Sequence, residues 1–271
     1  GTPLAARVFG HIHDIDRLAS PFAPLVNAVM GGPMWGVGAR VLGVAPSRRF
    51  PTLAGESFDR WWARRGPTRP DDCPGGSWNP RHLAGTDPCE PTTAPDNGLR
   101  EAAANDARPR ESDGIRAIPA GARPTVVLFA DTFATFNEPS IGRAAFAVME
   151  AAGFDVIVPS RWCCGRPALS LGLVDVAVRG MRANLAVLAP LARAGLRIVV
   201  PEPSCASAFR DEMPDLLTRE GEHEDAVLVA AAVRTLDEFI AALLPGVPSF
   251  RPGPTEAVLH ARAPQALAAA V

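Results

Sequence analysis

Residues 125–133 read TVVLFADTF, residues 155–167 read DVIVPSRWCCGRP, and residues 196–205 read LRIVVPEPSC. Each segment opens with a short apolar run, which is typical of a strand that is buried on both faces of a parallel sheet. Each run then gives way to polar residues, proline, glycine or cysteine, as expected where a strand ends and a loop begins. The three segments therefore predict parallel strands at 126–130, 155–159 and 196–200.

Helical patterns separate these predicted strands. Over residues 139–152 the apolar positions recur at helical spacing, Pro139 suits a first turn, and Gly153 suits the residue just past the C-cap. Further helices are predicted over residues 173–194 and 204–217. Strands and helices that alternate in this way pack economically only as right-handed crossovers onto a parallel sheet. The predicted fold class is therefore α/β, a small parallel sheet flanked by helices.

Thr132, the pair Cys163 and Cys164, and Cys205 each follow the carboxyl end of a predicted strand. Ligands of open α/β sheets bind along that edge, so we expect these residues to converge in space. Ser204 is predicted to be an N-cap, which places Cys205 in the first helical turn, where the helix dipole favours a thiolate. Because the thiolate is the form of cysteine that binds metals, the cysteines are candidate ligands.

Composition limits the class of protein. The chain has 271 residues and a formal net charge of −2, which gives no electrostatic reason to expect nucleic acid or a membrane surface as a partner. It shows no transmembrane segment of the required ~20 apolar residues and no pattern of a signal peptide. We therefore expect a cytoplasmic location, with any membrane association made through partners. The five cysteines are odd in number and two are adjacent, which favours metal or redox chemistry over a disulfide scaffold.

Residues 1–66 are predicted to form a helical segment, because apolar residues recur there at helix-like spacing. It includes one helix over residues 35–42 and a short terminal helix that contains Phe58. His11 and His13 lie two apart, on different sides of a helix, which favours surface or packing histidines over a metal site.

Residues 67–124 are rich in Pro, Gly, Asp, Asn and Arg and lack a sustained apolar period, which predicts a disordered or loosely ordered linker. Cys73 and Cys89 lie inside it. They have no second pair and no nearby histidine, so they are more typical of incidental thiols than of a zinc site.

Residues 218–271 begin with a predicted amphipathic helix over 222–244. A strand is predicted to start at 256–260, shortly before the sequence ends. A sheet strand is rarely the last element of a domain without its partner, so we expect the C-terminus to be truncated.

The motif Cys163-Cys164-Gly165-Arg166-Pro167, followed about forty residues later by Glu202-Pro203-Ser204-Cys205, resembles the cysteine-rich CCG domain. That domain occurs in the cysteine-rich subunit of heterodisulfide reductase, in iron-sulfur subunits of glycolate oxidase and lactate-utilisation proteins, and at the C-terminus of bacterial FAD-linked oxidases. Further similar sequence lies at 138–145, 149–154 and 209–217. The segment 1–65 is similar to the helices that join an upstream ferredoxin module to this domain.

The resemblance implies an iron-sulfur cluster of the 4Fe-4S type with three thiolate ligands: Cys163, Cys164 and Cys205. Gly165, Thr132 and Ser204 are the other residues expected beside this cofactor. The implied function is the electron-transfer part of an oxidoreductase that acts on 2-hydroxy acids such as glycolate or D-lactate. The flavin, FAD, is expected on an upstream domain or partner, and a ferredoxin-type module is a second expected partner.

The chain departs from the family pattern at several positions. Thr132 stands where relatives usually carry a cysteine, although threonine there is similar to the FAD-linked branch, and Ser207 and Ala208 stand where a second cysteine usually follows Cys205. The second copy of the domain lacks its cysteines, so residues 125–217 resemble a first half and 218–271 the start of a second. The fourth ligand would then be Thr132, a residue of the missing half, or substrate.

Three other interpretations of the cysteines stay open. They are buried thiols in a degenerate structural or docking fragment, since cysteine packs as a small hydrophobe. They bind zinc, as one copy of the domain does in some relatives. Or the adjacent pair Cys163 and Cys164 carries thiol redox chemistry through a strained disulfide.

Overall fold

The computed structural model describes residues 3–32, 35–45, 48, 50–65 and 123–243. Almost all of the predicted linker, with Cys73 and Cys89, lies outside these residues, and so does the strand predicted at 256–260. The chain divides into two compact units, which are considered separately. The first unit takes residues 1–11 and those from 163 onward, and the second takes residues 12–162.

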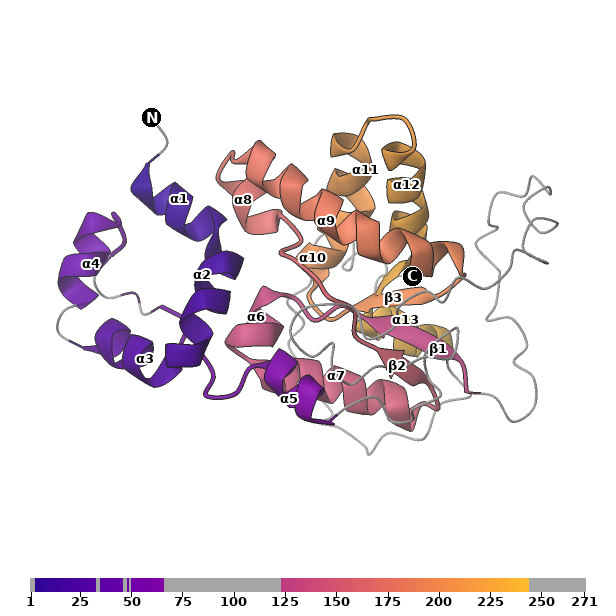
Figure 1. Cartoon of the computed structure of the whole chain (residues 1–271), viewed down its shortest axis with the longest axis horizontal. Helices are drawn as coiled ribbons and strands as arrows, with labels where there is room; N and C mark the ends of the chain where they lie inside the picture. Colours follow the sequence, from indigo (N-terminus) through magenta and orange to yellow (C-terminus); the bar gives the residue numbers. More distant parts are fainter. Residues whose placement is uncertain (1–2, 33–34, 46–47, 49, 66–122, 244–271) are drawn as a thin grey trace, which may run out of the picture. The chain divides into compact units, whose positions relative to one another are not determined.

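The described strands make up a small four-stranded parallel sheet flanked by helices, which confirms the predicted fold class (Figure 1). In the second unit, β1 (Thr125–Leu128) pairs in parallel with β2 (Asp155–Ile157), with Val126 opposite Val156. In the first unit, β3 (Arg197–Val200) pairs in parallel with β4 (Val233–Thr235), with Val199 opposite Arg234.

Burial explains why these segments are strands. Val127 in β1 and the three residues from Ile198 to Val200 in β3 are completely buried. Continuous apolar runs of this kind suit strands that are covered on both faces. The sequence prediction for these strands is therefore confirmed, within two residues at their ends.

The predicted crossover helices are present. In the second unit, α6 (Thr132–Phe136) and α7 (Pro139–Ala151) follow β1, and in the first unit α8 (Arg166–Ser170) and α9 (Val174–Arg193) precede β3. Gly153 and Gly195 lie just past the ends of α7 and α9 with φ of 91° and 79°, as helix termination by glycine requires. The two longer helices match the predicted ranges within one residue.

The helix predicted over 222–244 is wrong. The chain instead forms α12 (Glu222–Ala232), the strand β4, and α13 (Leu236–Leu243). The break falls where Val233 and Thr235, two β-branched residues, are buried at 0% and 2% exposure beside β3. Pairing with β3 satisfies the backbone there, and this tertiary gain overrides a spacing that also suits a helix.

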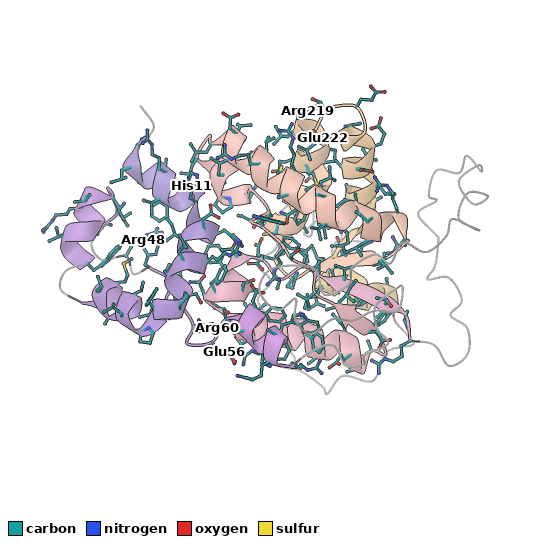
Figure 2. All side chains as sticks on the ribbon, viewed as in Figure 1. His11, Arg48, Glu56, Arg60, Arg219 and Glu222 are labelled. Carbon is teal, nitrogen blue, oxygen red and sulfur yellow. The ribbon has the colours of Figure 1, made fainter. Side chains whose placement is uncertain are left out.

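The segment predicted as one helix to Leu217 is also subdivided. It consists of α10 (Pro203–Ser207), the π-helical turn η4 (Ala208–Glu212) and α11 (Met213–Leu216). Ion pairs join α9 to α12 in the same unit: Arg182 Nε lies 3.0 Å from Glu222, which Figure 2 labels on α12, and Arg193 lies 2.5 Å from Asp225.

The helical N-terminal segment is confirmed. It comprises α1 (Leu4–Gly10), α2 (Ile12–Ala19), η1 (Ser20–Phe22), α3 (Ala23–Gly31), α4 (Trp35–Val41) and α5 (Phe58–Arg65). Among the described residues, no helix has both the length and the apolar character that a bilayer crossing requires.

Helix α2 and the turn η1 carry their side chains in an unusual arrangement. The polar residues His13, Asp16 and Ser20 are buried, at 6–7% exposure, whereas Leu18 and Phe22 are exposed at 75% and 63%. A helix on a protein surface normally shows the opposite pattern. An exposed apolar row of this kind is a feature of surfaces that contact other molecules.

Asp16 is the most costly group on the buried face. Its Oδ2 is buried without a hydrogen-bond partner, and burial raises the pKa of this carboxyl from 3.8 to about 6. The folded chain therefore holds the Asp16 proton more tightly than the unfolded chain does. Ionisation of Asp16 destabilises the fold fully above pH 6, and this cost disappears as the pH falls below 4.

Replacing Asp16 with Asn should raise the free energy of unfolding at pH 7.5 by up to about 3 kcal/mol, since each unit of pKa shift corresponds to about 1.4 kcal/mol. The gain should vanish at pH 3.5, and urea denaturation at both pH values measures it. Asp14→Asn, on the exposed side of α2, is the matched control and should change little. An equal effect of Asp16→Asn at both pH values would contradict this account.

Candidate cysteine site

The loop after β2 places Cys163 and Cys164 at the start of α8. Cys163 is partly exposed, Cys164 is buried at 3% exposure, and Gly165 caps α8 with a φ of 94°. A Cβ atom at Gly165 would lie 3.1 Å from Ala177 Cβ and 3.3 Å from Met181 Cε, both on α9. Only glycine allows this backbone conformation at so close an approach to α9.

Two further residues of α9 hold the same loop. Asn184 Nδ2 donates a hydrogen bond to the Cys163 carbonyl oxygen at 3.0 Å, and a Cβ atom at Gly180 would lie 3.0 Å from that oxygen. Asn184 is 1% exposed, so its amide is committed to this contact. The sequence prediction missed both residues, although an asparagine between Met181 and Leu185 on the apolar face of α9 was a signal.

The third cysteine, Cys205, lies in the first turn of α10, as predicted. The N-cap is Glu202, whose carboxylate accepts a hydrogen bond from the Cys205 backbone N–H at 2.7 Å. The prediction that Ser204 is the N-cap is therefore wrong. Pro203 occupies the first helical position, and the Ser204 hydroxyl donates to the Glu202 carboxylate instead of to the helix.

The sulfur atoms of Cys164 and Cys205 are in contact. The Cys164 thiol donates to Cys205 Sγ at 2.9 Å, and neither residue is in a disulfide. Cys205 is buried at 8% exposure. The convergence of these two cysteines, 41 positions apart, is the spatial relation that the strand pattern predicted.

The thiols of this site share their protons. A hydrogen bond from Cys163 lowers the pKa of Cys164, but the hydrogen bond that Cys164 gives to Cys205, its burial and the charge of a Cys205 thiolate together raise it further. The net result is a Cys164 pKa well above its usual range. A metal that binds here has to displace this proton.

The donor set suits a soft metal in type, because three thiols meet without a carboxylate among them. Two thiolates on one tetrahedral ion lie roughly 3.8 Å apart, given metal–sulfur bonds of about 2.3 Å, so Cys164 and Cys205 would have to separate slightly. Across the part of the chain that the structure describes, no three His, Cys, Asp or Glu residues are arranged as a metal site.

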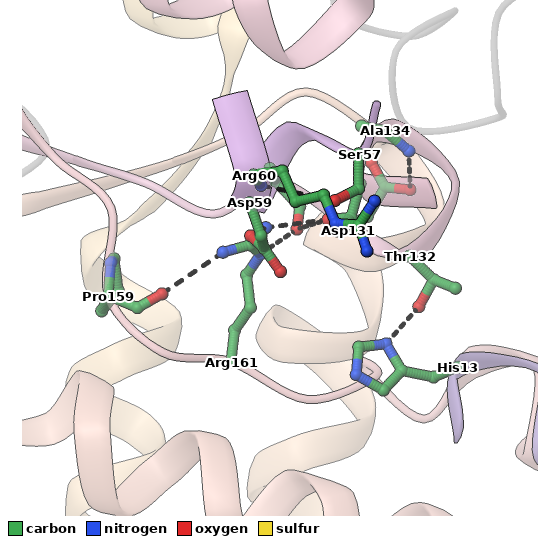
Figure 3. Close-up of polar contacts among 11 residues, drawn as sticks. His13, Ser57, Asp59, Arg60, Asp131, Thr132, Ala134, Pro159 and Arg161 are labelled. Atoms are coloured by element: carbon green, nitrogen blue, oxygen red, sulfur yellow. Dashed lines mark hydrogen bonds and ion pairs between the residues drawn. The ribbon is translucent and has the colours of Figure 1, made fainter. Parts of the chain in front are cut away.

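Thr132 belongs to the second unit, where it begins α6 after the N-cap Asp131. Figure 3 shows its hydroxyl facing the His13 ring, and Oγ1 lies 3.0 Å from Nδ1. Burial lowers the pKa of His13 to about 4, so this histidine is neutral at physiological pH and packs against α6. A role for Thr132 as a ligand, and for Ser204 beside a cofactor, stays a prediction.

Arg161, also in the second unit, was missed by the sequence prediction. Its guanidinium is 7% exposed and donates to the Ala130 carbonyl, to Thr135 Oγ1 at 2.8 Å and to Asp59 at 2.5 Å (Figure 3). It also lies 5.7 Å from the centre of the Phe58 ring. These contacts fix the loop after β2 two residues before the cysteine pair.

Comparison with known proteins gives a distant relationship. The chain is similar to the C-lettered subunit of the anaerobic glycerol-3-phosphate dehydrogenase of Escherichia coli strain K12, with 28% identity over 94 residues, and the match covers 34% of this chain and 24% of that subunit. Its counterpart of the same name from Escherichia coli O157:H7 matches equally. The chain therefore spans about a quarter of the length of these relatives. No family model and no solved structure matches it.

Gly165→Ala should destabilise the chain more than Gly153→Ala. Both glycines have φ near 90°, but a Cβ atom at Gly153 meets nothing within 4 Å. The control should cost about 1 kcal/mol for the backbone alone, and Gly165→Ala about 1 to 3 kcal/mol more because it overpacks α9. Urea denaturation measures both; equal losses would show that the approach to α9 is not tight.

Proposed function

We propose that this chain is the iron-sulfur electron-transfer part of a flavin-linked dehydrogenase. The observation that carries the proposal is the contact of two buried thiols, Cys164 and Cys205, beside Cys163. The distant similarity to a dehydrogenase subunit and the resemblance to the CCG domain support the same class.

In this proposal the thiolates of Cys163, Cys164 and Cys205 hold a cluster of the 4Fe-4S type, which accepts and releases single electrons when bound. Adjacent cysteines suit a cluster because neighbouring thiolates reach different irons. Gly165 and Asn184 position the first two sulfurs against α9, and Glu202 positions the third through the Cys205 backbone. The thiols give up their protons when the metal binds.

The electron donor in this proposal is FAD on another domain or a partner subunit, which oxidises a CH–OH group. The name of the two relatives gives glycerol 3-phosphate as the substrate of their enzyme, and the resemblance to FAD-linked oxidases gives a 2-hydroxy acid such as glycolate or D-lactate. Both substrates present the same reacting group to a flavin. A ferredoxin-type module is the proposed intermediate between the flavin and these cysteines.

Anaerobic reconstitution of the full chain with iron and sulfide tests the proposal. It should give a brown, EPR-active species with bound iron and sulfide, and Cys164→Ser and Cys205→Ser should each remove most of it. Cys73→Ser and Cys89→Ser are matched controls and should keep the signal. Iron that stays near zero, or a signal that survives Cys164→Ser, would overturn the proposal, and stoichiometric zinc in elemental analysis would replace iron with zinc.

A second candidate function, a docking protein that binds no metal, is favoured by the exposed apolar row on α2, η1 and α3. Ile15, Leu18, Phe22 and Leu25 are exposed at 37%, 75%, 63% and 67%. Side chains of this size at a surface are typical of a protein interface.

In the docking function, the double substitution Leu18→Glu and Leu25→Glu should weaken binding to a flavoprotein dehydrogenase at least tenfold, because it places two charges in an apolar contact. Calorimetric titration measures the affinity. Arg17→Glu, which changes charge on the same helix outside the row, is the control. Unchanged affinity in the double variant would exclude this row as the interface.

A further inference from the structure

The sulfur atoms of the site form a short series from the surface to the interior. Cys163 is partly exposed and its thiol bonds to Cys164, whose thiol in turn donates to the buried Cys205 at 2.9 Å. A disulfide bond is about 2.05 Å long, so the Cys164 and Cys205 sulfurs need to approach by only about 0.9 Å to be joined.

We propose that Cys164 and Cys205 are an oxidation site, which closes to a disulfide in the metal-free chain when a hydroperoxide reaches Cys163. The inference does not depend on the proposed iron-sulfur function, because it concerns the thiols before any metal binds. It also differs from a disulfide between the adjacent cysteines, because the sulfur contact runs from Cys164 to α10.

The first step takes place at Cys163, whose side chain solvent reaches. Its sulfur attacks one oxygen of the hydroperoxide, the O–O bond breaks, and an alcohol leaves, so that Cys163 becomes a sulfenic acid. The sulfur loses two electrons in this step, and the peroxide is reduced by the same two electrons.

The disulfide then passes inward. The Cys164 sulfur attacks Cys163, water leaves, and a bond forms between the adjacent cysteines. Cys205 next attacks Cys164 by thiol–disulfide exchange, its proton goes to the departing Cys163 sulfur, and the Cys163 thiol is restored. In sum, two thiols lose two electrons and two protons, and one hydroperoxide becomes one alcohol and one water.

Strain sets the direction of the exchange. A disulfide between adjacent residues departs from preferred disulfide geometry and is therefore more easily reduced. The bond between Cys164 and Cys205 joins α10 to the loop before α8 without that constraint, and the two side chains already touch. The exchange thus ends at the buried pair.

The test uses the full chain, freed of metal and reduced, and treated anaerobically with tert-butyl hydroperoxide. Remaining thiols are alkylated with iodoacetamide, and tandem mass spectrometry of the tryptic peptides locates them. The expected product links Cys164 to Cys205 and leaves Cys163 alkylated. Cys163→Ser should slow the loss of the other two thiols at least tenfold, whereas Cys73→Ser and Cys89→Ser should not.

Two results would overturn the proposal: a link that joins Cys163 to Cys164, or full alkylation of Cys164 and Cys205 after peroxide. Cys205→Ser separates loss of the reaction from loss of the fold, because it should stop at the adjacent disulfide while keeping the circular dichroism spectrum. Reconstitution of the reduced chain with iron is a separate measurement, so failure of the cluster proposal leaves this result interpretable.

Discussion

The close approach of the loop at Gly165 to α9 is the constraint on which the cysteine site depends. Backbone with a φ of 94° lies against Ala177 and Met181 with no room for a side chain. This contact and the hydrogen bond from Asn184 fix the main chain on both sides of Cys164. The thiol then has one direction available, toward α10, where the Glu202 cap holds Cys205.

Much of this arrangement was predictable from the sequence, because it depends on local patterns. Continuous apolar runs located β1, β2 and β3, and glycine and proline marked the ends of α7 and α9. The rule that ligands gather at the carboxyl ends of parallel strands predicted that Cys164 and Cys205 meet. Each of these signals lies within a few residues of the feature that it predicts.

The errors and omissions arise from contacts between distant segments. The spacing of Val233 suits a helix face as well as a strand, and only its pairing with β3 decides between them. Arg161 bonds to Ala130 and Asp59, which lie 31 and 102 positions away. Periodicity also predicts an apolar face on α2 without saying whether that face points to the interior or to solvent.

The buried face of α2 has a further consequence for the response to acid. His13 has a lowered pKa of about 4 against 6.5 unfolded, so its contribution to stability is complete above pH 6.5 and is lost as the pH falls toward 4. Asp16 has the opposite shift, from 3.8 to about 6, so its cost is relieved over nearly the same interval. Two neighbouring groups on one helix, each unfavourable to bury, thus titrate in compensation, and their combined effect on folding is nearly flat across mildly acidic conditions.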